Sequence, residues 1–209
     1  MQRYATLGDN MAARRKTALK IYDLRVELEE IEPLIWRRIL APGKITLPQL
    51  HDLLQLVMGW TNSRLHSFEI GERAFSMDGT DLEELNMLNE KKFTLDEVLG
   101  DSIREFTYEY DFGDSWRHHI TVTPIAKPRT DWSYPLCVAG ENAAPPDDVG
   151  GVSGYEEFLS AIKDPKHEEH DRMLEWIGGA FDPAGFDLNE INRTLRIGPR
   201  PYGKPDADR

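Results

Sequence analysis

The chain has 209 residues, of which 40% are hydrophobic and 10% aromatic, so it can bury one substantial core. No apolar run approaches the roughly 18–20 residues that span a bilayer, which predicts no membrane segment. The formal net charge of -12 argues against nucleic acid as a partner, because an acidic surface repels phosphates. The single cysteine excludes an internal disulfide, and no secretory signal is visible, so we expect a cytoplasmic protein.

Three segments divide the chain. We expect an N-terminal extension over residues 1–19, a single folded domain over residues 20–197 and a disordered tail over residues 198–209, which is rich in proline, glycine and charge. The domain begins with alternating apolar residues that predict two strands, over residues 21–31 and 35–40, joined by a turn.

Residues 46–60 change to helical spacing. Thr46 is the predicted N-cap, and Gln49 completes a capping box with it. His51 lies within the apolar stripe of this helix, which favours a packed, hydrogen-bonded histidine over a ligand.

Alternation returns over residues 65–70, where His66 shares a face with Phe68 and Ile70 and therefore points toward the core. A buried histidine needs a polar partner, and the carboxylates of the next hairpin are the candidates. Residues 78–99 are polar and acidic, and they predict a loop with one short helix that begins at Thr94.

The main hairpin covers residues 103–125 and carries aromatics, carboxylates and histidines around one tight turn. A three-residue loop, 113–115, keeps the apolar side chains on one face. The cross-strand pairs in that register are Phe112 with Trp116, Tyr110 with His118, Tyr108 with Ile120, Asp111 with Arg117, and Glu109 with His119. Asp114 at the tip either caps its own turn or joins a polar cluster.

Five prolines between residues 124 and 146 argue against a helix or a central strand there. The glycine-rich segment 145–155 follows, with Ser153 as the predicted N-cap of a helix. It is either a structural junction or a pocket wall whose Asp147 or Asp148 meets a ligand or cation. The functional interpretation requires that this loop and the hairpin tip lie side by side.

Two more helices are predicted, one from Asp164 to Gly178 and one that begins at Asp187. The first places His167, His170 and Asp171 on one face, where the charged neighbours favour a solvated surface over a metal site. The predicted fold class is α+β, an antiparallel sheet of hairpins with helices packed on one side.

Six ordered motifs across residues 20–197 resemble the plasmid pRiA4b ORF-3-like family. They are Trp36-Arg37-Arg38 with Met58-Gly59-Trp60, then Leu65-His66-Ser67-Phe68, then Tyr110 to Trp116 with His118, then Pro146 to Gly151, then Gly154-Tyr155, then Trp176 with Phe181-Asp182-Pro183. The resemblance implies an α+β domain of unknown function, in a family with some members labelled resolvase-like. Arg64 and Ala144 stand where histidine and cysteine are frequent in the family, which weakens an obligatory metal site.

Two function classes fit these residues. The first is a non-catalytic binding or adaptor domain with an aromatic-acidic groove for a protein or peptide. Its predicted pocket residues are His66, Tyr110, Asp111, Asp114, Trp116, His118, Asp147, Asp148 and Tyr155. The second is a metal-dependent hydrolase or nuclease associated with a mobile element, in which a divalent metal activates water. Its candidate ligands are His66, His118, Asp114 and Asp148.

Overall fold

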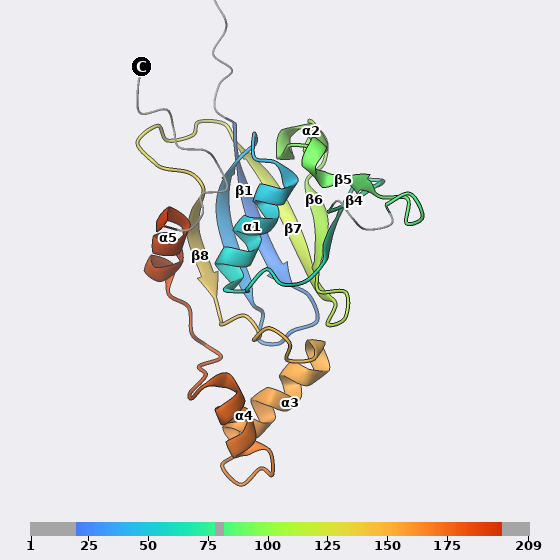
Figure 1. The fold of residues 1–209 in the computed structure, drawn as a ribbon. Coiled ribbons are helices and arrows are strands. Elements are labelled where there is room, and N and C mark those ends of the chain that lie inside the picture. Colours follow the sequence, from blue (N-terminus) through green and yellow to red (C-terminus); the bar gives the residue numbers. More distant parts are fainter. Residues whose placement is uncertain (1–19, 78–81, 198–209) are drawn as a thin grey trace, which may run out of the picture.

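The computed structural model describes residues 20–77 and 82–197 (Figure 1), so the predicted extension over 1–19 and tail over 198–209 lie outside the described residues. Within that part of the chain, an eight-stranded sheet runs in the order β5-β4-β3-β6-β7-β1-β2-β8. The strands are β1 (Ile21–Leu28), β2 (Trp36–Pro42), β3 (His66–Ile70), β4 (Arg73–Ser76), β5 (Leu88–Asn89), β6 (Glu105–Tyr110), β7 (Trp116–Ile125) and β8 (Leu136–Glu141). Every neighbouring pair is antiparallel except β4 and β5. The predicted α+β class is confirmed.

Helices complete the fold. They are α1 (Leu47–Met58), the 3-10 helix η1 (Glu90–Lys92), α2 (Leu95–Leu99), α3 (Gly151–Lys163), α4 (His170–Ile177) and α5 (Leu188–Ile197). Figure 1 shows α1 across one face of the sheet, α5 beside β8, and α3 with α4 beyond one end of the sheet. None of the helices in the described ranges is long and apolar enough to cross a membrane.

The predicted start of α1 is confirmed. The Thr46 hydroxyl accepts from the Gln49 backbone N–H, and the Gln49 side chain accepts from the Thr46 N–H. Gly59 ends the helix in the left-handed conformation that glycine tolerates. Leu50 and Leu54 are fully buried, so the predicted apolar stripe of α1 packs into the core.

The predicted register of the main hairpin is wrong by two residues. Tyr110 pairs with Trp116 and Tyr108 with His118, so the loop has five residues, 111–115. Asp111 causes the difference, because it adopts a φ of 57° and its carboxylate accepts from the Gly113 backbone N–H. Both loops have an odd number of residues, so the predicted buried face of the two strands is confirmed, whereas Phe112, which was predicted to lie on it, is in the loop and 43% exposed.

One strand and two helix starts differ from the predictions. Proline density concealed β8, which is an edge strand and so tolerates flanking prolines. Helix α3 begins at Gly151 after a left-handed Gly150, before the predicted cap at Ser153. Helix α4 begins at His170, because the Asp164 carboxylate caps a separate turn by accepting from the Lys166 backbone N–H.

Candidate functional site

Three loops meet at one end of the sheet, and hydrogen bonds between them set their positions. The Trp60 indole N–H donates to the Pro145 carbonyl at 2.8 Å. The Thr61 backbone N–H donates to Asp147 Oδ2 at 2.9 Å, and the Gly150 N–H donates to Asp114 Oδ2 at 3.2 Å. The hairpin tip and the 145–155 loop therefore lie side by side, which is the condition that the functional interpretation requires.

Arg64 adds a charged contact between the same loops. Its guanidinium forms an ion pair with Asp148, and its Nε lies 3.6 Å from Asp111 Oδ2. The Arg64 and Asp148 side chains are about half exposed, so the contribution to stability is small. This contact links Arg64 both to the hairpin tip, through Asp111, and to the 145–155 loop, through Asp148.

Backbone strain concentrates in this region. Seven non-glycine residues in the described ranges have positive φ, and four of them lie in these three loops. They are Asn62, Asp111, Ser115 and Asp148, with φ between 55° and 61°. Such conformations are costly and persist where the surrounding structure holds them, which is common at binding sites.

Replacing Gly151 with alanine should lower the free energy of unfolding by roughly 1–3 kcal/mol. Gly151 has a φ of 69°, and an added Cβ would lie 2.8 Å from the Asp114 backbone oxygen. Gly59 is the matched control, because its φ is 78° and no atom lies within 4 Å of its added Cβ. Urea unfolding should show a larger loss for Gly151→Ala than for Gly59→Ala; equal losses would contradict the close approach of the two loops.

The predicted aromatic side chains of the groove lie in the core. Tyr110 and Trp116 are each 1% exposed and Tyr155 is 3% exposed. The Trp60 ring stacks on Tyr110 with centroids 5.1 Å apart and lies 6.2 Å from the Trp116 ring. These rings are buried and pack against Trp60. That they contact a ligand directly remains a prediction.

His118 is also enclosed. Its ring is fully buried, its Nδ1 lies 3.3 Å from the Tyr108 carbonyl oxygen, and its Nε2 has no hydrogen-bond partner in the described residues. Burial lowers the pKa of His118 to about 4, because the interior penalises the imidazolium. His118 is therefore neutral at physiological pH.

A pocket of about 660 Å³ opens beside the hairpin tip, and we define it as the β3 pocket. It is lined by Pro48, His51 and Asp52 of α1, by residues 62–66, by Met77, Glu90 and Lys91, and by residues 111–113. Of the nine predicted pocket residues, His66 and Asp111 line it. Asp114, Asp147 and Asp148 lie in the loops beside it, where Asp114 and Asp147 accept backbone N–H groups and Asp148 pairs with Arg64.

The floor of the β3 pocket is a buried histidine–glutamate pair. His66 Nε2 lies 2.8 Å from Glu90 Oε2, and both side chains are 3% exposed. The partner of His66 is therefore Glu90 and not a hairpin carboxylate as predicted. Nδ1 of His66 has no hydrogen-bond partner in residues 20–77 and 82–197.

A second histidine covers the first. The rings of His51 and His66 are stacked, with centroids 3.5 Å apart and planes 5° apart. His51 Nδ1 lies 2.7 Å from the Tyr108 hydroxyl, and His51 Nε2 lies 2.6 Å from Asn62 Oδ1. Burial lowers the pKa of His51 to about 3, with repulsion from His66 as a further cause. The expectation of a packed, hydrogen-bonded histidine is confirmed.

The four candidate metal ligands do not converge. His66 bonds to Glu90, His118 to a carbonyl, Asp114 to a backbone N–H and Asp148 to Arg64. Across the described residues, no group of three or more His, Cys, Asp or Glu side chains has a metal-binding arrangement. The structure therefore provides no support for the predicted metal site, nor for one at His167, His170 and Asp171.

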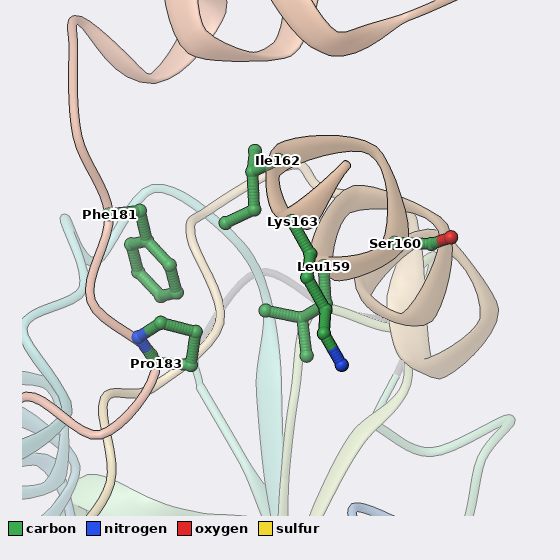
Figure 2. A pocket seen from close by; sticks show the side chains of 6 residues that line it. All are labelled: Leu159, Ser160, Ile162, Lys163, Phe181 and Pro183. Atoms are coloured by element: carbon green, nitrogen blue, oxygen red, sulfur yellow. The ribbon is translucent and has the colours of Figure 1, made fainter. Parts of the chain in front are cut away.

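A second crevice, of about 560 Å³, lies between α3 and the segment that precedes α5. Figure 2 shows Leu159 and Ile162 of α3 on one side of it, with Phe181 and Pro183 on the other. Its lining is mostly apolar, and among the described residues that line it Lys163 is the charged one. The β3 pocket, with its convergent polar groups, is the better candidate for a specific site.

Sequence reasoning missed Asp52 and Glu90, and it did not place His51 in a pocket. The one available signal for Glu90 was that a buried His66 requires a polar partner. Asp52 gave no signal, because a carboxylate on the polar side of an amphipathic helix is common.

Comparison with known proteins agrees with the motifs. The family model described as plasmid pRiA4b ORF-3-like protein matches residues 20–190. The uncharacterised protein y4hQ of Sinorhizobium fredii is 35% identical over 173 residues, which cover 82% of this chain and 89% of that protein. The crystal structure of MM3350, a protein of unknown function from Methanosarcina mazei Go1, is similar with a TM-score of 0.74 and 36% identity, covering 83% of this chain and 98% of that one. The chain belongs to the plasmid pRiA4b ORF-3-like family.

Proposed function

We propose that the protein is a non-catalytic binding domain whose β3 pocket docks a basic segment of a protein partner. The observation that carries this proposal is Asp52, a half-buried carboxylate on the pocket wall. It accepts a hydrogen bond from Asn62 Nδ2 at 3.1 Å, and no cation lies within ion-pair distance of it in the described ranges. Burial raises the pKa of Asp52, so a cationic partner would stabilise its charged form.

The other charges of the pocket are already engaged. Glu90 faces His66, and Arg64 is shared between Asp111 and Asp148. Lys91 also lines the pocket. Asp52 is thus the carboxylate that a docked cation would meet, and the net charge of -12 favours the approach of a basic partner.

The rim of the pocket supplies apolar contact. Leu65 is 44% exposed and Phe112 is 43% exposed, and both line the opening. A pocket lined by an exposed aromatic and by a carboxylate that has no ion-pair partner in the described residues suits a segment that alternates basic and apolar side chains. This supports a peptide or protein partner over a purely polar one.

Selection from a random peptide display library on immobilised protein should enrich sequences with a lysine or arginine beside a large apolar residue. The variant with both Asp52→Asn and Phe112→Ser should lose that enrichment, because it removes the acceptor charge and the apolar rim. Glu157→Gln, an exposed change on α3, is the matched control and should keep it. An enriched acidic consensus, or equal enrichment on the double variant, would overturn the proposal.

A further inference from the structure

We infer that the crevice between α3 and the segment before α5 docks a basic amphipathic helix of a partner protein. The crevice is apolar on both walls, and the part of the chain that forms it is strongly acidic. A helix with an apolar stripe and basic side chains beside it complements both properties. The crevice shares none of its described lining residues with the β3 pocket, so this surface is separate from that of the proposed function.

Glycines at the end of α4 let the chain fold back beside α3. Gly178 has a φ of 81° and Gly179 a φ of 135°, and both directly follow α4. Phe181 then packs edge-on against the Phe158 ring of α3, with centroids 5.3 Å apart. The crevice lies between α3 and this returning segment (Figure 2). Its volume of about 560 Å³ is within the range of roughly 300–1,000 Å³ that is typical of binding pockets.

The apolar side chains around the crevice are only partly covered by the protein. Leu159, Ile162 and Phe181 are half-buried. The Trp176 ring also packs edge-on against Phe158, at 5.8 Å, and is 46% exposed. In α4, which the structure describes in full, no residue is buried. Partly exposed apolar side chains around a crevice, with a tryptophan in contact with the same core ring, are typical of a protein-docking surface.

The crevice offers side-chain contacts and few main-chain groups. Pro183 has no N–H, and its carbonyl oxygen accepts from the Ala143 backbone N–H at 2.9 Å. The Asp182 carbonyl oxygen accepts from the Gly185 N–H, also at 2.9 Å. The opposite wall is α3, whose main chain is paired within the helix. An extended peptide binds through main-chain hydrogen bonds, whereas a helix satisfies its own backbone and docks by side chains, so this crevice favours a helix.

The charge around the crevice favours a basic occupant. Residues 151–187 carry nine acidic and three basic side chains. Beside the crevice, Glu156 lies one turn of α3 before Leu159, and Asp182 lies in the returning segment; both are exposed. Lys163, in the last turn of α3, is the cation among the described lining residues. Because the acidic side chains outnumber it, a basic helix is attracted to this surface.

An NMR titration of the full chain with a synthetic leucine–lysine peptide tests this inference. The peptide has leucine at helical spacing. One control peptide replaces lysine with glutamate at the same spacing, and the other alternates leucine and lysine strictly. We expect the helical leucine–lysine peptide to shift the backbone signals of Leu159, Ile162 and Phe181 saturably. Both control peptides should bind about tenfold more weakly or not at all.

Single variants check the groups that the inference uses. Glu156→Lys should weaken binding of the helical leucine–lysine peptide about threefold to tenfold, because it reverses an exposed charge without touching the core. Lys163→Gln should strengthen binding about twofold to threefold, because it removes an opposing cation. Leu159→Ser should weaken binding about tenfold through the lost apolar contact. The matched controls Glu72→Lys and Leu85→Ser, at exposed positions elsewhere, should bind as the unchanged protein does.

Three results would overturn the inference. They are binding that neither Glu156→Lys nor Leu159→Ser weakens, weaker binding after Lys163→Gln, and the absence of saturable shifts on α3. Shifts that gather at residues 62–66 and 111–113 would place the peptide in the β3 pocket, which would defeat this inference and leave the proposed function standing. Binding on α3 that persists in the variant with both Asp52→Asn and Phe112→Ser would support the inference whether or not the β3 pocket docks a partner.

Discussion

Replacing Glu90 with leucine should lower the free energy of unfolding by about 3–5 kcal/mol. Glu90 is the one partner of the buried His66 imidazole in the described residues, so its removal leaves both ring nitrogens unsatisfied. Urea unfolding followed by circular dichroism measures the change. The matched control is Glu84→Leu, an exposed position in the same segment, which should change stability by no more than about 0.5 kcal/mol.

The double variant with leucine at both His66 and Glu90 sharpens this test. Because it removes the buried polar groups together, it should be more stable than Glu90→Leu alone. A loss for Glu90→Leu as small as that for Glu84→Leu would contradict a buried pair at this position. A double variant less stable than Glu90→Leu would show that His66 does not depend on Glu90 as its buried polar partner.

Glu90 also shows where sequence reasoning stopped. The inward position of His66 was predictable, because alternation over β3 is a local pattern. Its partner lies 24 residues further along the chain, in a segment where glutamates recur without apolar periodicity. The short parallel contact of β4 with β5 brings Glu90 back to the sheet, and no local signal distinguishes it from Glu83 or Glu84.

The hairpin shows a different limit. An odd number of loop residues keeps the apolar side chains of the two strands on one face, so the buried face of the strands was predictable without the exact loop length. The loop length depended on Asp111, which could continue the strand or cap the turn. Its side chain accepts from two backbone N–H groups, and that local competition decides the register by two residues.

The loop carboxylates show why a candidate site cannot be read from residue types. Asp114 and Asp147 were predicted as ligand-binding groups, and the structure has both accepting backbone N–H groups from neighbouring loops. A carboxylate that positions a loop and one that meets a ligand have the same local sequence. The loops meet as the functional interpretation requires, but which carboxylates are engaged within the protein is visible only with the side chains in place.

The protein should lose stability as the pH falls from about 6.5 toward 4, and His118 should account for a large part of the loss. Its ordinary pKa of 6.5 applies in the unfolded chain, and burial lowers it to about 4 in the folded protein. Between pH 6.5 and about 4, His118 therefore binds a proton in the unfolded state but not in the folded state. The stability present above pH 6.5 falls by about 3 kcal/mol by pH 4 through this residue alone.

Urea unfolding at a series of pH values from 7 to 4 measures this dependence, and His118→Leu isolates it. The variant should be less stable at pH 7, because packing changes, but its free energy of unfolding should fall less steeply with acid. His119→Leu, at the half-exposed neighbour on β7, should keep the steep fall of the unchanged protein. Because His51 is also buried and neutral, with a pKa of about 3, the His118→Leu variant should retain part of the slope. A slope unaffected by His118→Leu would mean that the ring accepts a proton in the folded state, which its enclosure beneath Trp60 and Tyr108 should prevent.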